Sequence, residues 1–96
     1  MARRKKLKFD TKAVGEKLKK QRFAHGYTSC AKLSEAIEQK TGVSLSPQLL
    51  YKFEAGTQDM KLAQAAAIAL TFEERQGEWE FYLSQLMKAG GLKARW

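Results

Sequence analysis

The chain has 96 residues, which is enough for one domain with a small core and too few for two. Its 18 lysine and arginine residues outnumber its 10 aspartate and glutamate residues, giving a formal net charge of +8. Because Cys30 is the only cysteine, an internal disulfide and a cysteine-based zinc site are excluded. No apolar run approaches the roughly 18 residues of a membrane span, and the basic start lacks the apolar segment of a signal peptide. We therefore expect a cytoplasmic protein.

The positive charge is concentrated near the beginning of the chain. Residues 1–26 contain ten basic and two acidic side chains, whereas the remaining residues contain eight of each. We expect residues 1–9 to form a flexible basic arm, whose charged side chains are Arg3, Arg4, Lys5, Lys6 and Lys8. This pattern is typical of proteins that bind a nucleic-acid phosphate backbone. A solubilising tail would look the same, whereas membrane anchoring is disfavoured because the arm has little apolar area.

The composition favours an all-α chain, and helix start and stop signals divide it into five helices. Asp10 or Thr11 can cap a first helix that ends at His25 and Gly26. Thr28 or Ser29 can cap a second helix that runs towards a glycine at position 42. The residues expected on its inner face are Leu33, Ala36 and Ile37.

The second half of the chain predicts two more helices after residue 56. Asp59 can cap a fourth, alanine-rich helix, whose expected inward residues are Leu62, Ala65, Ala66 and Ala69. Residues 71–74 match a capping box and predict the start of a fifth helix, with Gly77 inside it and Gly90 at its end. Its expected apolar stripe is Phe72, Trp79, Tyr82, Leu83 and Leu86, which leaves Phe81 outside.

Residues 46–56 predict a short third helix, between the second and the fourth. Ser46 can cap it, Pro47 suits its first position, and Gly56 supplies a left-handed stop. The residues that can point to one side of it are Leu45, Leu50 and Phe53.

The other side of this third helix carries Gln48, Tyr51 and Lys52. Glutamine can pair with adenine, lysine can reach guanine or phosphate, and tyrosine can stack or bond a phosphate. The pattern is that of a DNA-recognition helix. An ordinary amphipathic helix with a solvated face would show the same residues.

This order of elements resembles the Cro/repressor-type helix-turn-helix family, also called XRE. Residues 15–22, G-E-K-L-K-K-Q-R, are similar to the family's first helix, and residues 26–29 with Leu33 are similar to the start of its second. Residues 50–56, L-Y-K-F-E-A-G, are similar to the end of its third helix. The resemblance covers roughly residues 13–70. It implies a five-helix lambda-repressor-like fold, with the helix-turn-helix DNA-binding domain at residues 10–72 and a C-terminal helix and tail, a possible dimerisation or partner surface, at residues 73–96.

The resemblance also implies that Arg22 and Glu54 form an ion pair that joins the first helix to the end of the third. The alternative is that both side chains face water. The chain departs from the family between Leu33 and Leu50, where it is about six residues longer than usual. We attribute these residues to an extra turn of the second helix and a longer connector. Ser34, which is commonly alanine in the family, is a second departure.

By the resemblance, the third helix enters the major groove of double-stranded DNA. The expected base-contacting residues are Gln48, Tyr51, Lys52 and Leu49, although a leucine at the position of Leu49 more often lies in the core. The expected phosphate-contacting residues are Thr28, Ser29, Ser46, Gln58, Lys61, Lys12 and Lys17. Capping alone would explain the serines and the threonine. The basic arm is expected to neutralise the backbone or enter the minor groove.

Catalysis is not expected, because no nucleophile, base and acid occur in a recognisable set, and neither a metal nor a cofactor site is predicted. We expect a small transcriptional regulator, most simply a repressor that occupies an operator. The alternatives are an antitoxin that binds a protein toxin through its C-terminal region, and a basic RNA- or ribosome-binding protein. A homodimer is also expected, with Phe81, Leu92 and Trp96 at its surface; Trp96 could instead fold back on the monomer's core.

Overall fold

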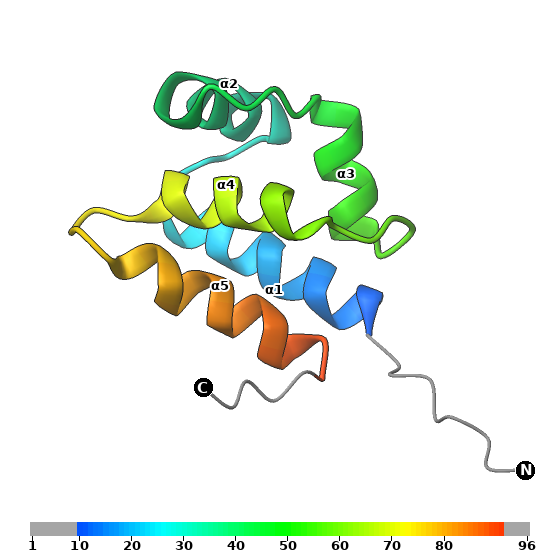
Figure 1. The fold of residues 1–96 in the computed structure, drawn as a ribbon. Coiled ribbons are helices and arrows are strands. Elements are labelled where there is room, and N and C mark those ends of the chain that lie inside the picture. The colour runs from blue at the N-terminus through cyan, green and yellow to red at the C-terminus, as the bar shows by residue number, and fades with distance from the viewer. Residues whose placement is uncertain (1–9, 92–96) are drawn as a thin grey trace, which may run out of the picture.

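The computed structural model describes residues 10–91, which form five α-helices and no strand. The helices are α1 (Thr11–Ala24), α2 (Cys30–Thr41), α3 (Pro47–Ala55), α4 (Leu62–Phe72) and α5 (Glu78–Ala89). The all-α prediction is therefore confirmed for this part of the chain. In Figure 1, α1, α4 and α5 run side by side, and α3 crosses their direction at one end of the molecule. The basic arm, Leu92 and Trp96 lie outside the described residues.

The first three helices each begin at a predicted cap candidate, and the structure selects Asp10 over Thr11 and Ser29 over Thr28. The carboxylate of Asp10 accepts a hydrogen bond from the amide of Ala13 at 3.0 Å. The hydroxyl of Ser29 accepts from the amide of Lys32 at 3.2 Å, and that of Ser46 from the amide of Leu49 at 3.1 Å. Each cap satisfies an amide that the first helical turn leaves free, which explains why the sequence located these starts correctly.

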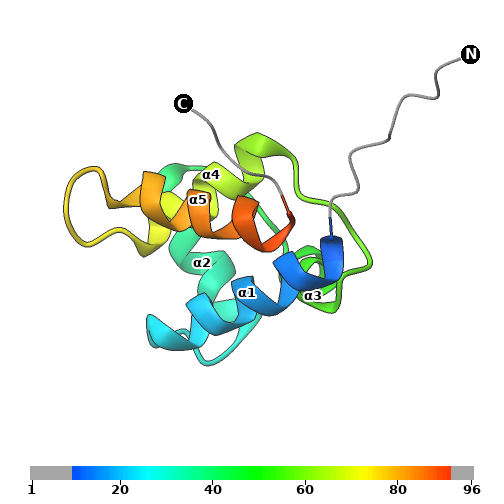
Figure 2. The same cartoon turned by 90° about the horizontal axis from the view of Figure 1, so that it is seen from below.

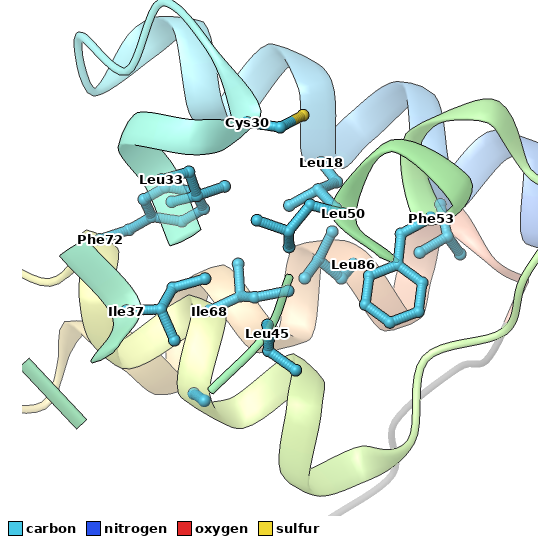
Figure 3. Packing of buried hydrophobic residues seen from close by; sticks show 12 residues of the cluster. Leu18, Cys30, Leu33, Ile37, Leu45, Leu50, Phe53, Ile68, Phe72 and Leu86 are labelled. Carbon is cyan, nitrogen blue, oxygen red and sulfur yellow. The ribbon is translucent and has the colours of Figure 1, made fainter. Parts of the chain in front are cut away.

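The core forms where the apolar faces of all five helices meet. Leu18, Leu50 and Leu86 come together at its centre, as Figure 3 shows, and each is fully buried. The other buried apolar residues include Leu33, Ile37, Leu45, Phe53, Ile68 and Phe72. The predicted inward residues of α2 and α3 therefore lie in the core, except Ala36, which is only partly buried. Helix α3 has only its other side left for a partner.

The segment between α2 and α3 accounts for the distance along the chain from Leu33 to Leu50. The connector, residues 42–46, runs back along α2, so that α3 begins beside the helix that precedes it (Figure 1). Ser34, in the second turn of α2, donates a hydrogen bond from its hydroxyl to the carbonyl of Leu45. The connector thus brings the chain back over the distance that α2 covers. The hydrogen bond from Ser34 fixes the connector to α2.

The predicted start of α4 is wrong. Asp59 does not cap α4, because its carboxylate accepts a hydrogen bond from the hydroxyl of Thr11 in α1. The helix begins at Leu62, where the backbone amide of Lys61 donates to the side-chain oxygen of Gln64 at 2.8 Å. Leu62 was expected inward, yet 68% of it is exposed, because it stands at the first position of the helix, beyond the edge of the core.

The predicted start of the fifth helix is also wrong. Thr71 is part of α4, where its buried hydroxyl donates to the carbonyl of Ala67 at 2.8 Å, and Phe72 ends that helix inside the core. A loop follows. Gly77 precedes α5 with a φ of 90°, a left-handed conformation that glycine adopts at little cost. The carboxylate of Glu73 then accepts from the amide of Trp79 at 3.2 Å and serves the cap role that we expected of Thr71.

Helix α5 is attached to the rest of the molecule along its length. The amide of Asp10 donates to the carbonyl of Gly90 at 2.9 Å, which joins the start of α1 to the end of α5. His25, which ends α1, packs edge-on against Tyr82 of α5 with ring centroids 4.9 Å apart. Residues 73–91 therefore pack as part of the same body as the preceding helices. Among the described helices, none has the length and apolarity needed to cross a bilayer.

Candidate nucleic-acid interface

The outer side of α3 presents a stripe of exposed side chains, which we call the α3 stripe. It consists of Gln48, Tyr51, Lys52 and Ala55, all exposed, with Tyr51 at 68%. These positions follow the i, i+3, i+4 and i+7 spacing that places residues on one side of a helix. The sequence singled out the first three. Ala55 was missed, although the same spacing could have found it.

Leu49 lies at the edge of the α3 stripe rather than in it. It is partly buried and packs against the hydrophobic core. The position of Leu49 therefore agrees with a role in the core and disfavours contact between its side chain and a thymine methyl.

Behind the α3 stripe, a buried ion pair fixes the end of α3 against α1. Nε of Arg22 lies 2.7 Å from Oε2 of Glu54, and a terminal nitrogen of the guanidinium donates to Oε1 at 3.1 Å. Both side chains are only 6% exposed. The other terminal nitrogen of Arg22 donates to the carbonyl of Tyr27 at 2.9 Å, and the thiol of Cys30 donates to Glu54 at 3.4 Å. One cluster thus joins α1, α3 and the start of α2.

The electrostatics of this cluster reinforce the charged form of the pair. The hydrogen bonds that Arg22 donates to Glu54, and then the negative charge of Glu54, raise the pKa of Arg22 above its ordinary value, although burial opposes this. Burial raises the pKa of the Cys30 thiol to about 11, and the neighbouring charge of Glu54 adds to the shift. Cys30 is therefore a neutral thiol at ordinary pH. Its hydrogen bond to the carboxylate is its contribution to the cluster.

Two glycines allow α1 and α3 to approach closely. A Cβ atom at Gly15 would lie 2.3 Å from the carbonyl oxygen of Phe53, and one at Gly56 would lie 2.7 Å from Cα of Lys12. Real Cβ atoms do not approach so near, so these positions require glycine. In the sequence, Gly15 is identified only as part of the family resemblance. The contact that explains it joins residues 38 positions apart and is visible only in three dimensions.

Most of the predicted phosphate-contacting residues lie at the helix ends on either side of this crossing. Thr28 and Ser46 are exposed at the starts of α2 and α3, and Ser29 is partly buried as the cap of α2. Gln58 and Lys61 are exposed in the loop after α3, which the bond from Thr11 to Asp59 ties to the start of α1. Lys12 is exposed and contacts Gly56 at the end of α3. Lys32, in the first turn of α2, is exposed and was missed.

Lys17 lies elsewhere. It lines a groove between α1 and α5, together with Phe81 and Lys88, rather than the surface around α3. The structure therefore separates Lys17 from the other predicted phosphate-contacting residues.

No family model matches this chain, and no curated protein or solved structure matches it either.

Acidic side chains gather in the segment between α4 and α5, with Arg75 among them. The loop between α4 and α5, with the first turn of α5, carries four glutamates, Glu73, Glu74, Glu78 and Glu80. This loop lies at the opposite end of the molecule from α3 in both views (Figures 1 and 2). The start of α1, to which the basic residues 1–9 are joined, lies at the α3 end. Within residues 10–91, no three potential metal-ligating side chains gather at one place.

Proposed function

We propose that this protein is a sequence-specific, double-stranded DNA-binding transcriptional regulator with a lambda-repressor-like helix-turn-helix domain, and that it acts as a repressor. One observation carries the proposal. The α3 stripe projects polar side chains from a helix whose other side is immobilised by the core and by the Arg22–Glu54 pair.

The dimensions and chemistry of α3 suit the major groove of DNA. A helix with its side chains is about 10–12 Å across, and the major groove of B-DNA is about 12 Å wide. Gln48, in the first turn, can pair with adenine, whereas Tyr51 and Lys52 can bond phosphates or guanine. Because α3 is already fixed in the free protein, little conformational entropy would be lost when it binds.

The charge distribution supports the same orientation on DNA. With α3 in the groove, Lys12, Gln58 and Lys61 would flank one side of the helix, and Thr28 would lie at the start of the neighbouring helix. The glutamates between α4 and α5 would point away from the phosphates. A repressor of this kind would act by occupying its operator and blocking polymerase.

The two alternative functions make different demands on the same molecule. An antitoxin would keep the DNA-binding surface and use the C-terminal region for its toxin, and exposed Phe81 on α5 is a feature that such a contact could use. An RNA- or ribosome-binding protein would use the basic charge without reading a duplex sequence. The first alternative predicts a protein partner, and the second predicts a preference for RNA.

Selection of bound duplexes from a random double-stranded DNA library tests the proposal directly. We expect one enriched sequence element, and we expect that excess RNA does not weaken binding of the protein to it. Gln48→Ala should relax the preference at one base pair by roughly 1–3 kcal/mol, whereas the control Lys61→Ala should weaken all sequences alike. No enriched element, or equal losses for both variants on specific and random DNA, would reject base reading by the α3 stripe.

A further inference from the structure

A groove of about 410 Å³ lies between α1 and α5, which run side by side in Figures 1 and 2. Its volume is within the range of about 300–1,000 Å³ that is usual for small-molecule sites. The lining residues are Lys17 of α1 and Phe81, Ser84, Gln85, Lys88 and Ala89 of α5. This set includes no residue of the α3 stripe, so the proposed DNA contact leaves the groove open.

The polar side chains of the groove can all donate hydrogen bonds. Lys17 and Lys88 each bring an ammonium group, and Ser84 brings a hydroxyl. The side-chain oxygen of Gln85 accepts a hydrogen bond from Gln21 of α1 at 3.2 Å, which leaves the amide nitrogen of Gln85 for a ligand. No carboxylate is among the described lining residues. A negatively charged group that accepts several hydrogen bonds therefore suits the groove.

The two positive charges of the groove are not neutralised by the chain itself. Within residues 10–91, neither Lys17 nor Lys88 forms an ion pair. Residues 1–9 and 92–96 contain no acidic side chain and are themselves basic, so their charge disfavours them as occupants. A phosphate monoester has three acceptor oxygens and about −1.5 to −2 charges at neutral pH, and it matches two ammonium groups better than a singly charged carboxylate does.

Beside these donors, Phe81 offers an aromatic surface. Its side chain is 58% exposed, whereas Phe53 and Phe72 are fully buried. The ring of Phe81 packs in a T-shaped arrangement with Tyr82, with centroids 5.5 Å apart, and Tyr82 packs in turn against Phe72 in the core. Phe81 is therefore held in place while more than half of its surface stays open. A planar ring such as a nucleobase can stack on such a surface.

The aromatic ring and the donors are close enough for one small molecule to contact both. Phe81, Ser84 and Lys88 follow the i, i+3 and i+7 spacing and lie on one side of α5. Side chains of a helix lean towards its N-terminus, so the long side chain of Lys88 extends towards Ser84. Ser84 is less than one turn from Phe81, or roughly 5 Å along the helix axis. A phosphate beside Ser84 would therefore lie next to a ring stacked on Phe81.

A second surface groove, of about 430 Å³, lacks two of these features. It is lined by Lys19, Lys20 and Phe23, but also by Glu16, whose carboxylate would repel a phosphate. All four lining residues belong to α1, so no second helix contributes to the groove. It therefore serves as a control for the groove between α1 and α5.

We propose that the groove between α1 and α5 binds a nucleoside monophosphate. Its base stacks on Phe81, and its phosphate accepts hydrogen bonds from Lys17, Lys88 and the amide nitrogen of Gln85. The site goes beyond the proposed function, because it uses none of the α3 stripe and does not require DNA.

Isothermal titration calorimetry with adenosine monophosphate, adenosine and inorganic phosphate tests the site. Adenosine and inorganic phosphate should each bind roughly tenfold more weakly than adenosine monophosphate, because each lacks one of the two sets of contacts. Phe81→Ala should raise the dissociation constant of adenosine monophosphate roughly tenfold and leave that of inorganic phosphate unchanged. Lys17→Ala and Lys88→Ala should each weaken binding of both molecules roughly fivefold.

Lys20→Ala and Phe23→Ala are the matched controls, since they remove an exposed lysine and an exposed aromatic ring from the second groove. Both should leave the binding of adenosine monophosphate unchanged. Circular dichroism and thermal unfolding show whether each variant is folded. The inference would be overturned if adenosine monophosphate bound no more tightly than inorganic phosphate, or if the controls weakened its binding as much as the substitutions at Lys17, Phe81 and Lys88.

Discussion

The Arg22–Glu54 pair helps to orient the α3 stripe, although neither residue is part of that stripe. Two hydrogen bonds join a guanidinium and a carboxylate that are each only 6% exposed, and Tyr27 and Cys30 occupy further hydrogen-bonding positions around them. A buried ion pair adds little to the stability of the fold compared with two apolar residues in its place. Loss of one partner, however, leaves the other as an unpaired buried charge. Its main contribution is to hold the end of α3 in one orientation.

Glu54→Ala should therefore destabilise the fold by about 3–5 kcal/mol, because it strands the buried charge of Arg22. Urea denaturation measures the loss, and the control Glu35→Ala, at an exposed position of α2, should stay within about 0.5 kcal/mol of the wild type. Arg22→Ala and the double variant complete the cycle. Losses that simply add would mean that the two side chains do not interact.

Cys30 predicts a distinct pH dependence. Its pKa rises from 9.0 to about 11 on folding, because burial disfavours the thiolate and Glu54 adds negative charge nearby. The unfolded chain therefore loses the thiol proton first, and the folded state loses stability as the pH rises from about 9 to about 11. The loss should be on the order of 2 kcal/mol. The free energy of unfolding of wild type minus that of Cys30→Ala should fall over this interval, and a constant difference would contradict the assignment.

At the scale of elements, the decisive contact is the crossing of α1 and α3. Gly15 lets the backbone of α1 rest against the carbonyls of Phe53 and Glu54, immediately beside the buried pair. The connector from residue 42 to residue 46 acts at the other end of α3, where Ser34 holds it to α2. Both ends of the proposed recognition helix are therefore fixed by contacts outside the helix itself.

Gly15→Ala tests the crossing by the sign of its effect. At an ordinary position inside a helix, replacement of glycine by alanine stabilises by roughly 0.5–1 kcal/mol. Here the added methyl would lie 2.3 Å from a backbone oxygen, so we expect a loss of about 1–3 kcal/mol instead. Thermal or urea unfolding gives the sign directly. A stabilised variant would show that the two helices are farther apart than described.

At the scale of the whole molecule, the glutamates between α4 and α5 and the proposed recognition helix lie at opposite ends. The glutamates of the α4–α5 loop lie at one end, and α3 lies with the start of α1 at the other. Ten of the 18 basic residues occur within the first 26, and residues 1–9 are joined to α1 at the α3 end. A polyanion would therefore be attracted to the end that carries the α3 stripe.

Binding to DNA should accordingly weaken steeply with salt, because each phosphate neutralised adds about −0.9 to the slope of log K against log salt. Deletion of residues 1–8 should make that slope shallower, while the preference for the selected sequence stays the same. Fluorescence anisotropy at several salt concentrations, on the selected duplex and on a scrambled one, measures both quantities. An unchanged slope would place the arm away from the DNA.

The sequence alone determined the local features of this protein. The cap at Ser46, the stop at Gly56 and the exposure of Gln48, Tyr51 and Lys52 follow from neighbouring residues and helical spacing, which are local properties. The starts of α1 and α2 were each narrowed to two neighbouring cap candidates. At the starts of α4 and α5 the local signal failed. Asp59 and Thr71 each looked like a cap, but the hydroxyl of Thr11 engages the first, and α4 simply continues through the second.

Tertiary structure decided everything that depends on contacts between distant segments. The requirement for glycine at position 15, the anchoring of the connector by Ser34 and the separation of Lys17 from the α3 stripe each involve residues far apart in the chain. The Arg22–Glu54 pair came from a family resemblance, and only packing showed it to be buried. Helical periodicity fixes which side of a helix is apolar, but the approach of one helix to another depends on the shapes of both.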